Sequence, residues 1–251
     1  HGEDVSRRVA EALQADLLTT ADLVREASRE SGIHEVRMHK ALAGPRSVFD
    51  RFTHEKDRSL AWFRVALARA VQRDGLVFRG LMGHLLPRNL THVLRVGLNA
   101  RRTYRAENAA RNAGTSPLEE ENKLAADDET IPRWAASLVG LGPWDKSLFD
   151  IFLPMDSTPV DEAVRLIVEN SGSNALQIDD ALRGALNDFL ISAQVSLALA
   201  EEGKATDVDV SVVDREVTIT INRYVIWIER LEKELTRIAS TVDGIANVTT
   251  R

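Results

Sequence analysis

The sequence lacks three things that would point to common classes of function. It contains no cysteine among its 251 residues, which excludes a disulfide framework, a zinc–thiolate site and a thiol nucleophile. Aromatic residues make up only 5%, too few for the base-stacking surface of a single-strand-binding protein. No apolar run approaches the roughly 20 residues of a membrane-spanning helix. We therefore expect a soluble protein, with the cytoplasm as its default compartment.

Positive charge is also in short supply. Lys and Arg total 32 against 38 for Asp and Glu, which gives a formal net charge of -6. No global field then attracts nucleic acid or an anionic membrane face, so neither is expected as a partner. Any phosphate-binding site must be built locally. The length allows two domains with substantial cores.

The first two-thirds of the chain alternates between strand and helix patterns. Short apolar runs predict buried strands at residues 76–78, 91–98 and 150–153. Helical periodicity predicts helices that are listed here by position: residues 4–13, 59–73, 101–112 and a helix introduced by Pro159. This alternation is typical of a parallel α/β sheet.

The remaining third reads differently. A polar break at residues 169–174 is the best boundary, so we predict domains at 1–172 and 173–251. The second unit begins with a long helix over about 179–200. Strictly alternating strands follow at 207–212 and 217–221, then a helix and a short final strand. This is an α+β pattern.

Several segments of the first domain resemble the cytidylate kinase-like family. Residues 1–13 resemble the end of the phosphate-binding loop and the first helix, with Gly2 as the visible loop glycine. Residues 74–80 resemble a later strand, and residues 93–107 the next strand and the start of the lid helix. Residues 144–164 resemble the last strand and helix. The resemblance covers about residues 1–170 and implies a P-loop nucleoside monophosphate kinase fold.

The resemblance implies an activity and a set of site residues. The family transfers a phosphoryl group from ATP, with Mg²⁺, to a nucleoside monophosphate. The implied residues are basic side chains and one glycine, in three roles: Arg105 and Arg133 in catalysis, Gly2, Arg79 and Arg111 in nucleotide binding, and Arg37, Arg46 and Arg51 in binding the acceptor. Each arginine also fits a solvated surface position.

The sequence departs from the family pattern at two places. Phe78 stands where the family has a glycine before its arginine. In the lid, Ile131 replaces an arginine and Pro132 breaks the helix beside it. Loss of such an arginine costs about 10³ in rate by analogy with arginine fingers. The alternative is therefore a catalytically degenerate kinase fold that senses a nucleotide or holds a partner, with binding that outlasts turnover.

No metal cluster is expected. His34, His39 and His54 lack metal-ligand spacing on one face. Asp127, Asp128 and Asp145 could help to hold Mg²⁺ only through nucleotide phosphates.

The last seventy or so residues resemble the BON domain, although the usual turn glycine is missing at Arg215. We expect this unit to fold separately and to mediate association, either with the kinase-like domain or with a second chain, as a homo-oligomer or with another protein. The helix carrying Trp227 and Leu231 should pack on the apolar face of the strands. Membrane binding is disfavoured because the polar face of that helix mixes both charge signs.

The resemblance finally predicts an arrangement in space. The strands near residues 76–78, 93–98 and 150–153 should lie together in one parallel sheet. Gly2 and Arg79 should then meet at its carboxyl edge, where open α/β sheets bind ligands.

Overall fold

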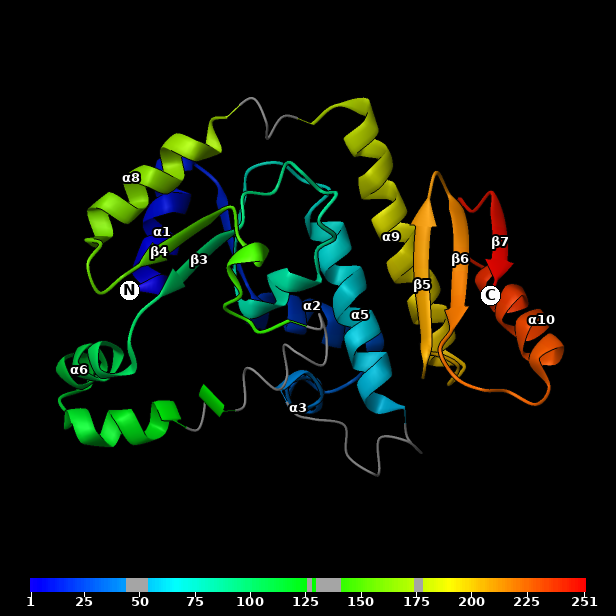
Figure 1. The fold of residues 1–251 in the computed structure, drawn as a ribbon, viewed down its shortest axis with the longest axis horizontal. Helices are drawn as coiled ribbons and strands as arrows, with labels where there is room; N and C mark the ends of the chain where they lie inside the picture. The colour runs from blue at the N-terminus through cyan, green and yellow to red at the C-terminus, as the bar shows by residue number, and fades with distance from the viewer. Residues whose placement is uncertain (44–53, 126–127, 130–140, 174–177) are drawn as a thin grey trace.

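A computed structural model describes residues 1–43, 54–125, 128–129, 141–173 and 178–251 (Figure 1). Its helices are α1 (Gly2–Leu13), α2 (Thr20–Ser31), α3 (Glu35–Ala43), α5 (Glu55–Ala70), α6 (Arg102–Ala113), α8 (Val160–Ser171), α9 (Asp180–Glu201) and α10 (Ile228–Ala239). Its strands are β1 (Asp16–Thr19), β2 (Leu76–Arg79), β3 (Val96–Asn99), β4 (Ile151–Pro154), β5 (Val208–Val213), β6 (Glu216–Ile221) and β7 (Asn247–Thr250). The predicted mixture of strands and helices is confirmed.

The parallel strands form two pairs. β1 pairs with β2, and β3 pairs with β4, each in parallel register over four residues. The expectation that β2, β3 and β4 share one hydrogen-bonded sheet is therefore wrong for the described residues. The sequence analysis missed β1, because a four-residue strand with two adjacent leucines shows no periodicity that distinguishes it from the end of a helix.

Apolar packing joins the two strand pairs. Val5 and Val9 of α1 meet Ala163 and Ile167 of α8 in one buried cluster, which we call the α1–α8 core. Val77 of β2 and the apolar residues of β3 and β4 pack against the same cluster. Figure 1 shows α8 running alongside α1 next to β3 and β4. The pairs are thus neighbours even though no backbone ladder between them is present in the described part.

Helix α5 is the centre of a second buried cluster, the α5 core. Its side chains are buried around the helix, including Phe63, which is fully buried. Helices α2 and α3 contact α5. Helix α9 contacts it as well, and its Leu182, Leu186 and Phe189 belong to the α5 core. A helix whose buried side chains extend over much of its circumference needs cover from several neighbours, and α9 provides part of that cover.

Helix α9 also belongs to the C-terminal core. Val195 and Leu199 on α9 pack with Val217 and Ile219 of β6 and with Leu235 of α10. Helix α9 therefore contributes buried side chains to both the α5 core and the C-terminal core. Its end is fixed to α5, because Glu201 Oε1 accepts a hydrogen bond from Trp62 Nε1 (2.8 Å).

The C-terminal sheet has the order β5-β6-β7, with β5 antiparallel and β7 parallel to β6. Asp214 and Arg215 form the β5–β6 turn with positive φ angles of 52° and 65°. Glycine normally adopts this conformation at least cost. Here the Asp188 carboxylate accepts both turn N–H groups, at 2.8 and 2.9 Å, which explains how the turn forms without glycine.

The predicted position of Trp227 is wrong. Leu231, Leu235 and Ile238 of α10 pack on the sheet as expected, but the Trp227 side chain is 77% exposed. Trp227 is the N-cap residue of α10 and precedes its first turn. Periodicity extended one position too far because the cap does not share the helical backbone conformation.

No helix in the described ranges has the length and apolar character needed to cross a bilayer.

Candidate functional site

The N-terminal turn of α1 meets the carboxyl ends of the parallel strands. Arg79, the last residue of β2, places Nη1 3.5 Å from Glu3 Oε2 in the first turn of α1. His1 Nε2 lies 3.1 Å from the Tyr104 hydroxyl on α6, the helix that follows β3, and the two rings stack at 5.7 Å. His1 and Glu3 thus contact α6 and the end of β2, respectively. Gly2 stands in the sequence between His1 and Glu3, and Glu3 is the residue that pairs with Arg79.

Tight local packing fixes the backbone next to Arg79. A Cβ atom at Gly80 would collide with Thr20 Oγ1 at the start of α2. It would also lie 3.3 Å from the Phe78 ring. Only a glycine therefore lets the chain leave β2 so close to α2, and this exit direction positions the Arg79 side chain.

Two arginines of α6 converge on one carboxylate. Arg102 Nε and Arg105 Nη2 donate to Asp128 Oδ2 at 2.8 and 2.6 Å. Their spacing of three residues puts them on the same face of the helix. Burial raises the pKa of Asp128, but the hydrogen bonds from Arg105 and Arg102 outweigh it, so the net pKa is below its ordinary value. Asp128 is therefore held as an anion.

One N–H donor of Arg105 has no acceptor among the described residues. This donor is the Nε atom, which is buried. A buried donor left without an acceptor is costly. The unsatisfied Nε leaves this guanidinium able to donate one more hydrogen bond than the one from Nη2 that Asp128 accepts.

The end of β4 completes the edge. Asp156 accepts hydrogen bonds from the Arg101 backbone N and from Arg101 Nε, both at 3.1 Å. These bonds join the segment after β4 to the start of α6. The sequence analysis did not single out Arg101, Arg102, Tyr104 or Asp156. Their position directly after two parallel strands was the available signal.

Two further predicted arginines, Arg111 and Arg37, make their contacts away from this edge. Arg111, at the far end of α6, donates to Asn108 Oδ1 at 2.6 Å and lines an open hollow of about 350 Å³ with Glu107 and Pro117. Arg37 lies on α3 and pairs with Glu55 at 3.9 Å. Arg46, Arg51 and Arg133 lie outside the described residues.

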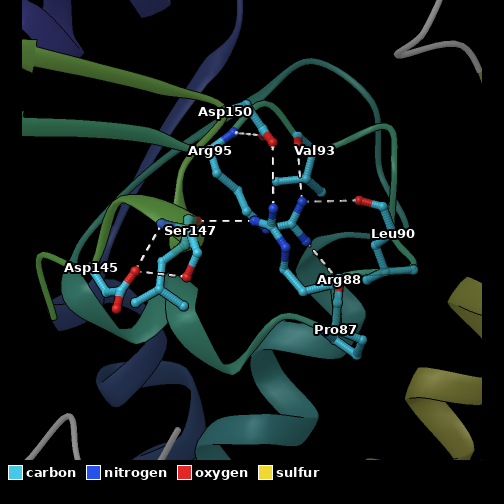
Figure 2. A network of polar contacts seen from close by, with 9 residues as sticks. Pro87, Arg88, Leu90, Val93, Arg95, Asp145, Ser147 and Asp150 are labelled. Atoms are coloured by element: carbon cyan, nitrogen blue, oxygen red, sulfur yellow. Dashed lines mark hydrogen bonds and ion pairs between the residues drawn. The ribbon is translucent and has the colours of Figure 1, made fainter. Parts of the chain in front are cut away.

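The opposite edge of β3 and β4 carries a different polar network (Figure 2). Arg95 Nη2 donates to the Pro87 carbonyl at 2.7 Å, and Nη1 donates to the carbonyls of Leu90 and Val93 at 3.4 and 3.2 Å. Asp150 accepts the Arg95 backbone N–H at 2.7 Å. This network ties the loop before β3 to the start of β4.

Asp145 belongs to that opposite edge. Its Oδ1 accepts from Ser147 N and Ser147 Oγ at 2.9 and 2.7 Å and caps the short 3₁₀ turn Lys146–Leu148. Asp127 lies outside the described residues. Within the part of the chain that the structure describes, no group of three His, Asp or Glu residues could hold a metal ion.

The comparison with known families covers the part of the chain that contains this edge. The model of the cytidylate kinase-like family matches residues 1–157, which span α1, both parallel strand pairs and α6. The chain belongs to the cytidylate kinase-like family. No curated protein and no solved structure matches the chain.

The small parallel sheets are compatible with the nucleotide kinase-like fold of a cytidylate kinase-like protein. The match ends between β4 and α8. It therefore includes every residue of the carboxyl edge described above and stops before the helix that packs against α1.

Proposed function

We propose that this cytidylate kinase-like protein binds the phosphates of a nucleotide at the carboxyl edge of its parallel strands. The observation that carries the proposal is the meeting of three basic or dipolar groups there. These are the N-terminal turn of α1, Arg79 at the end of β2, and the Arg102–Arg105 face of α6. A helix N-terminus favours an anion through its unpaired N–H groups and its dipole.

The side chains at this edge suit phosphate oxygens. Asp128 places one carboxylate oxygen against two guanidinium groups, which is the contact that a phosphate oxygen makes with arginine. The Arg105 Nε, which has no partner among the described residues, supports a site for a further acceptor oxygen. Within the described ranges Arg79 pairs with the exposed Glu3 at 3.5 Å, and such an exposed pair contributes little to stability and exchanges readily.

The finer proposal is transfer of a phosphoryl group from ATP to a nucleoside monophosphate. ATP would supply the phosphoryl group, and Mg²⁺, held through the nucleotide's phosphates, would neutralise part of its charge. The protein's own part is to position and to neutralise: Gly2 and Arg79 hold the phosphates, and Arg105 with Arg133 compensates charge on the moving group. Arg111 remains a proposed nucleotide contact, and Arg37, Arg46 and Arg51 remain proposed acceptor contacts.

The alternative is a kinase-derived fold that binds a nucleotide without turning it over. Two observations favour it. Asp128 already neutralises the α6 arginines. The sequence has Ile131 where the resemblance places a lid arginine, with Pro132 beside it. Rate acceleration depends on positive charge that is available in the transition state. We therefore propose that this protein retains affinity for a nucleotide although its turnover is slow or lost.

The proposal includes a second unit. Residues 173–251 would be a BON-like α+β unit, supported by the order of helix, hairpin, helix and strand from α9 to β7. Its proposed task is association rather than catalysis. Its sheet has exposed polar side chains, such as Asp209 and Ser211, on the side away from α9 and α10.

Two measurements test the function. Calorimetric titration of the full chain with ATP and with CMP, with and without Mg²⁺, measures binding. A coupled assay for ADP release measures turnover. We expect ATP binding with slow or no turnover. Robust turnover with CMP contradicts the degenerate alternative, and absence of affinity for any nucleotide contradicts the whole proposal.

A further inference from the structure

The loop between β6 and α10 exposes large apolar side chains. Tyr224 is 94% exposed, and Ile226 and Trp227 are each 77% exposed. They lie within four consecutive residues. Aromatic residues are only 5% of this sequence, so leaving two of them in water at one place needs an explanation.

The backbone conformation of the loop directs these side chains toward solvent. Val225, between Tyr224 and Ile226, packs against the C-terminal core. Turning Val225 inward turns both of its neighbours toward solvent. Trp227 is fixed from the other side, because its carbonyl accepts the Leu231 N–H at 3.2 Å as the N-cap of α10.

The start of the loop is fixed as well. Asn222 donates its backbone N–H to the Asp207 carbonyl at 2.8 Å and its side-chain Nδ2 to Asp209 Oδ2 at 2.5 Å. Aromatic side chains on an anchored backbone lose little conformational entropy when they are covered. The loop is thus preorganised to bind rather than loosely exposed.

We propose that Tyr224, Ile226 and Trp227 form the contact surface through which two copies of this chain associate. Together these side chains expose roughly 500 Å², since a buried aromatic side chain accounts for about 150–250 Å². A stable interface needs about 800 Å² from each partner. The patch therefore provides more than half of one side of a dimer and forms its apolar centre.

The charges around the patch favour a second copy over other occupants. Arg223 precedes the patch and Glu229 and Arg230 follow it, all exposed. A two-fold interface brings the same surface onto itself, so its rim must carry both charge signs to be self-complementary. A lipid surface would instead favour a uniformly basic rim. The mixed rim thus argues for self-association.

Sedimentation velocity of the full chain tests the proposal. Interfaces of this size range from micromolar to picomolar affinity, so a concentration series from about 1 to 100 µM should show a dimer. The double variant Tyr224→Ser with Trp227→Ser should weaken association at least about 100-fold, because central aromatic residues carry most of the binding energy. At a concentration where the wild type is monomeric, the thermal stability of the variant should not fall, since both side chains are exposed in the single chain.

Val213→Ser is the matched control. Val213 is 68% exposed on the same sheet, but at the β5–β6 turn, the opposite end from the β6–α10 loop. This variant should dimerise as the wild type does. A wild type that is monomeric throughout the series, or a double variant that associates as strongly as the wild type, overturns the proposal.

The absence of cysteine allows a geometric test. Ile226→Cys introduces a single thiol, and oxidation should link two copies through it if the patch lies near the two-fold axis. Val213→Cys should not crosslink under the same conditions. Flotation with neutral and with anionic phospholipid vesicles distinguishes the remaining occupant, since vesicle binding by a chain that stays monomeric would also overturn the proposal.

Discussion

The two ends of strands β3 and β4 use arginine in opposite ways. At the amino end, Arg95 donates to three main-chain carbonyls, those of Pro87, Leu90 and Val93 (Figure 2). At the carboxyl end, Arg105 donates to one side-chain carboxylate and retains a buried Nε without a partner among the described residues. The residue type is the same, but the acceptors differ.

The difference separates a structural arginine from one suited to a ligand. Main-chain carbonyls are fixed by the fold, so Arg95 can leave them only if the loop before β3 unfolds. A carboxylate on a side chain can rotate away and be replaced by another anion. The nature of the acceptor therefore indicates function better than the presence of arginine does, and the comparison can be broken by substitution at each end.

The largest effect should follow from removing Arg95. Arg95→Met keeps the apolar stem but leaves three carbonyls without their donor, and we expect a loss of about 3 kcal/mol in the free energy of unfolding. Urea denaturation measures it. Arg165→Met is the control, because Arg165 pairs with the exposed Glu162 and Glu169 on α8, and this substitution should cost less than about 1 kcal/mol. Equal losses would remove the distinction between the two kinds of arginine.

A substitution within β3, between its amino and carboxyl ends, should lower the stability of the fold. A Cβ at Gly97 of β3 would lie 2.7 Å from Phe152 and 2.9 Å from Phe149, so Gly97→Ala should destabilise the fold by about 2 kcal/mol through overpacking. Gly184→Ala in α9 is the matched control. It meets no atom within 4 Å, and it should stabilise the helix by up to about 1 kcal/mol.

Circular dichroism during urea denaturation distinguishes these two glycine variants. If Gly97→Ala were as stable as the wild type, the close packing of the two phenylalanines over β3 would be incorrect. The opposite sign expected for Gly184→Ala guards against a general effect of alanine.

At the carboxyl edge, function should suffer more than stability. Arg105→Ala should lower the affinity for ATP about 10-fold or more, because a charge-assisted contact to phosphate is lost. The free energy of unfolding should fall by no more than about 1 kcal/mol, since the partner Asp128 keeps Arg102. Calorimetric titration and urea denaturation of the same preparation give both numbers. The comparison fails if the stability loss equals that of Arg95→Met while affinity is unchanged.

The sequence predicted well the elements whose residues repeat over many positions. Helix α9 and the β5–β6 hairpin were located to within one or two residues because their periodicities are long and regular. β1 was missed because four residues carry no period. Trp227 was assigned to the helix face because a pattern cannot show where the cap ends and the first turn begins.

The candidate site was less accessible to sequence reasoning. The sequence predicted that Gly2 and Arg79 would meet because both lie at the ends of elements whose relative position a parallel α/β arrangement fixes, and the structure pairs Arg79 with Glu3, the neighbour of Gly2. Arg111 was grouped with them because it lies on α6, yet it is six residues beyond Arg105 and roughly 9 Å farther along the helix axis. The role of Asp128 depends on a tertiary contact across 23 residues, which no local pattern encodes.

The smallest effect expected concerns pH. The pKa of Asp128 is lowered because the Arg105 and Arg102 hydrogen bonds outweigh the opposing effect of burial. A carboxylate with a lowered pKa in the folded protein contributes stability above its unfolded pKa of about 3.9. That contribution is lost as the pH falls from there through the lower pKa of the folded state. At pH 7, Asp128→Asn should therefore cost about 1 kcal/mol, and the difference from the wild type should shrink as the pH is lowered below about 4. Urea denaturation of both proteins across this range measures the difference. Taking the difference cancels the acid sensitivity of all other carboxylates, which both proteins share.

The same substitution removes the anion that competes for the two arginines, so ATP affinity at pH 7 should rise a few-fold. A difference that is independent of pH, or a loss of ATP affinity in Asp128→Asn, would mean that Asp128 is a fixed structural acceptor like the carbonyls around Arg95, and not an exchangeable one.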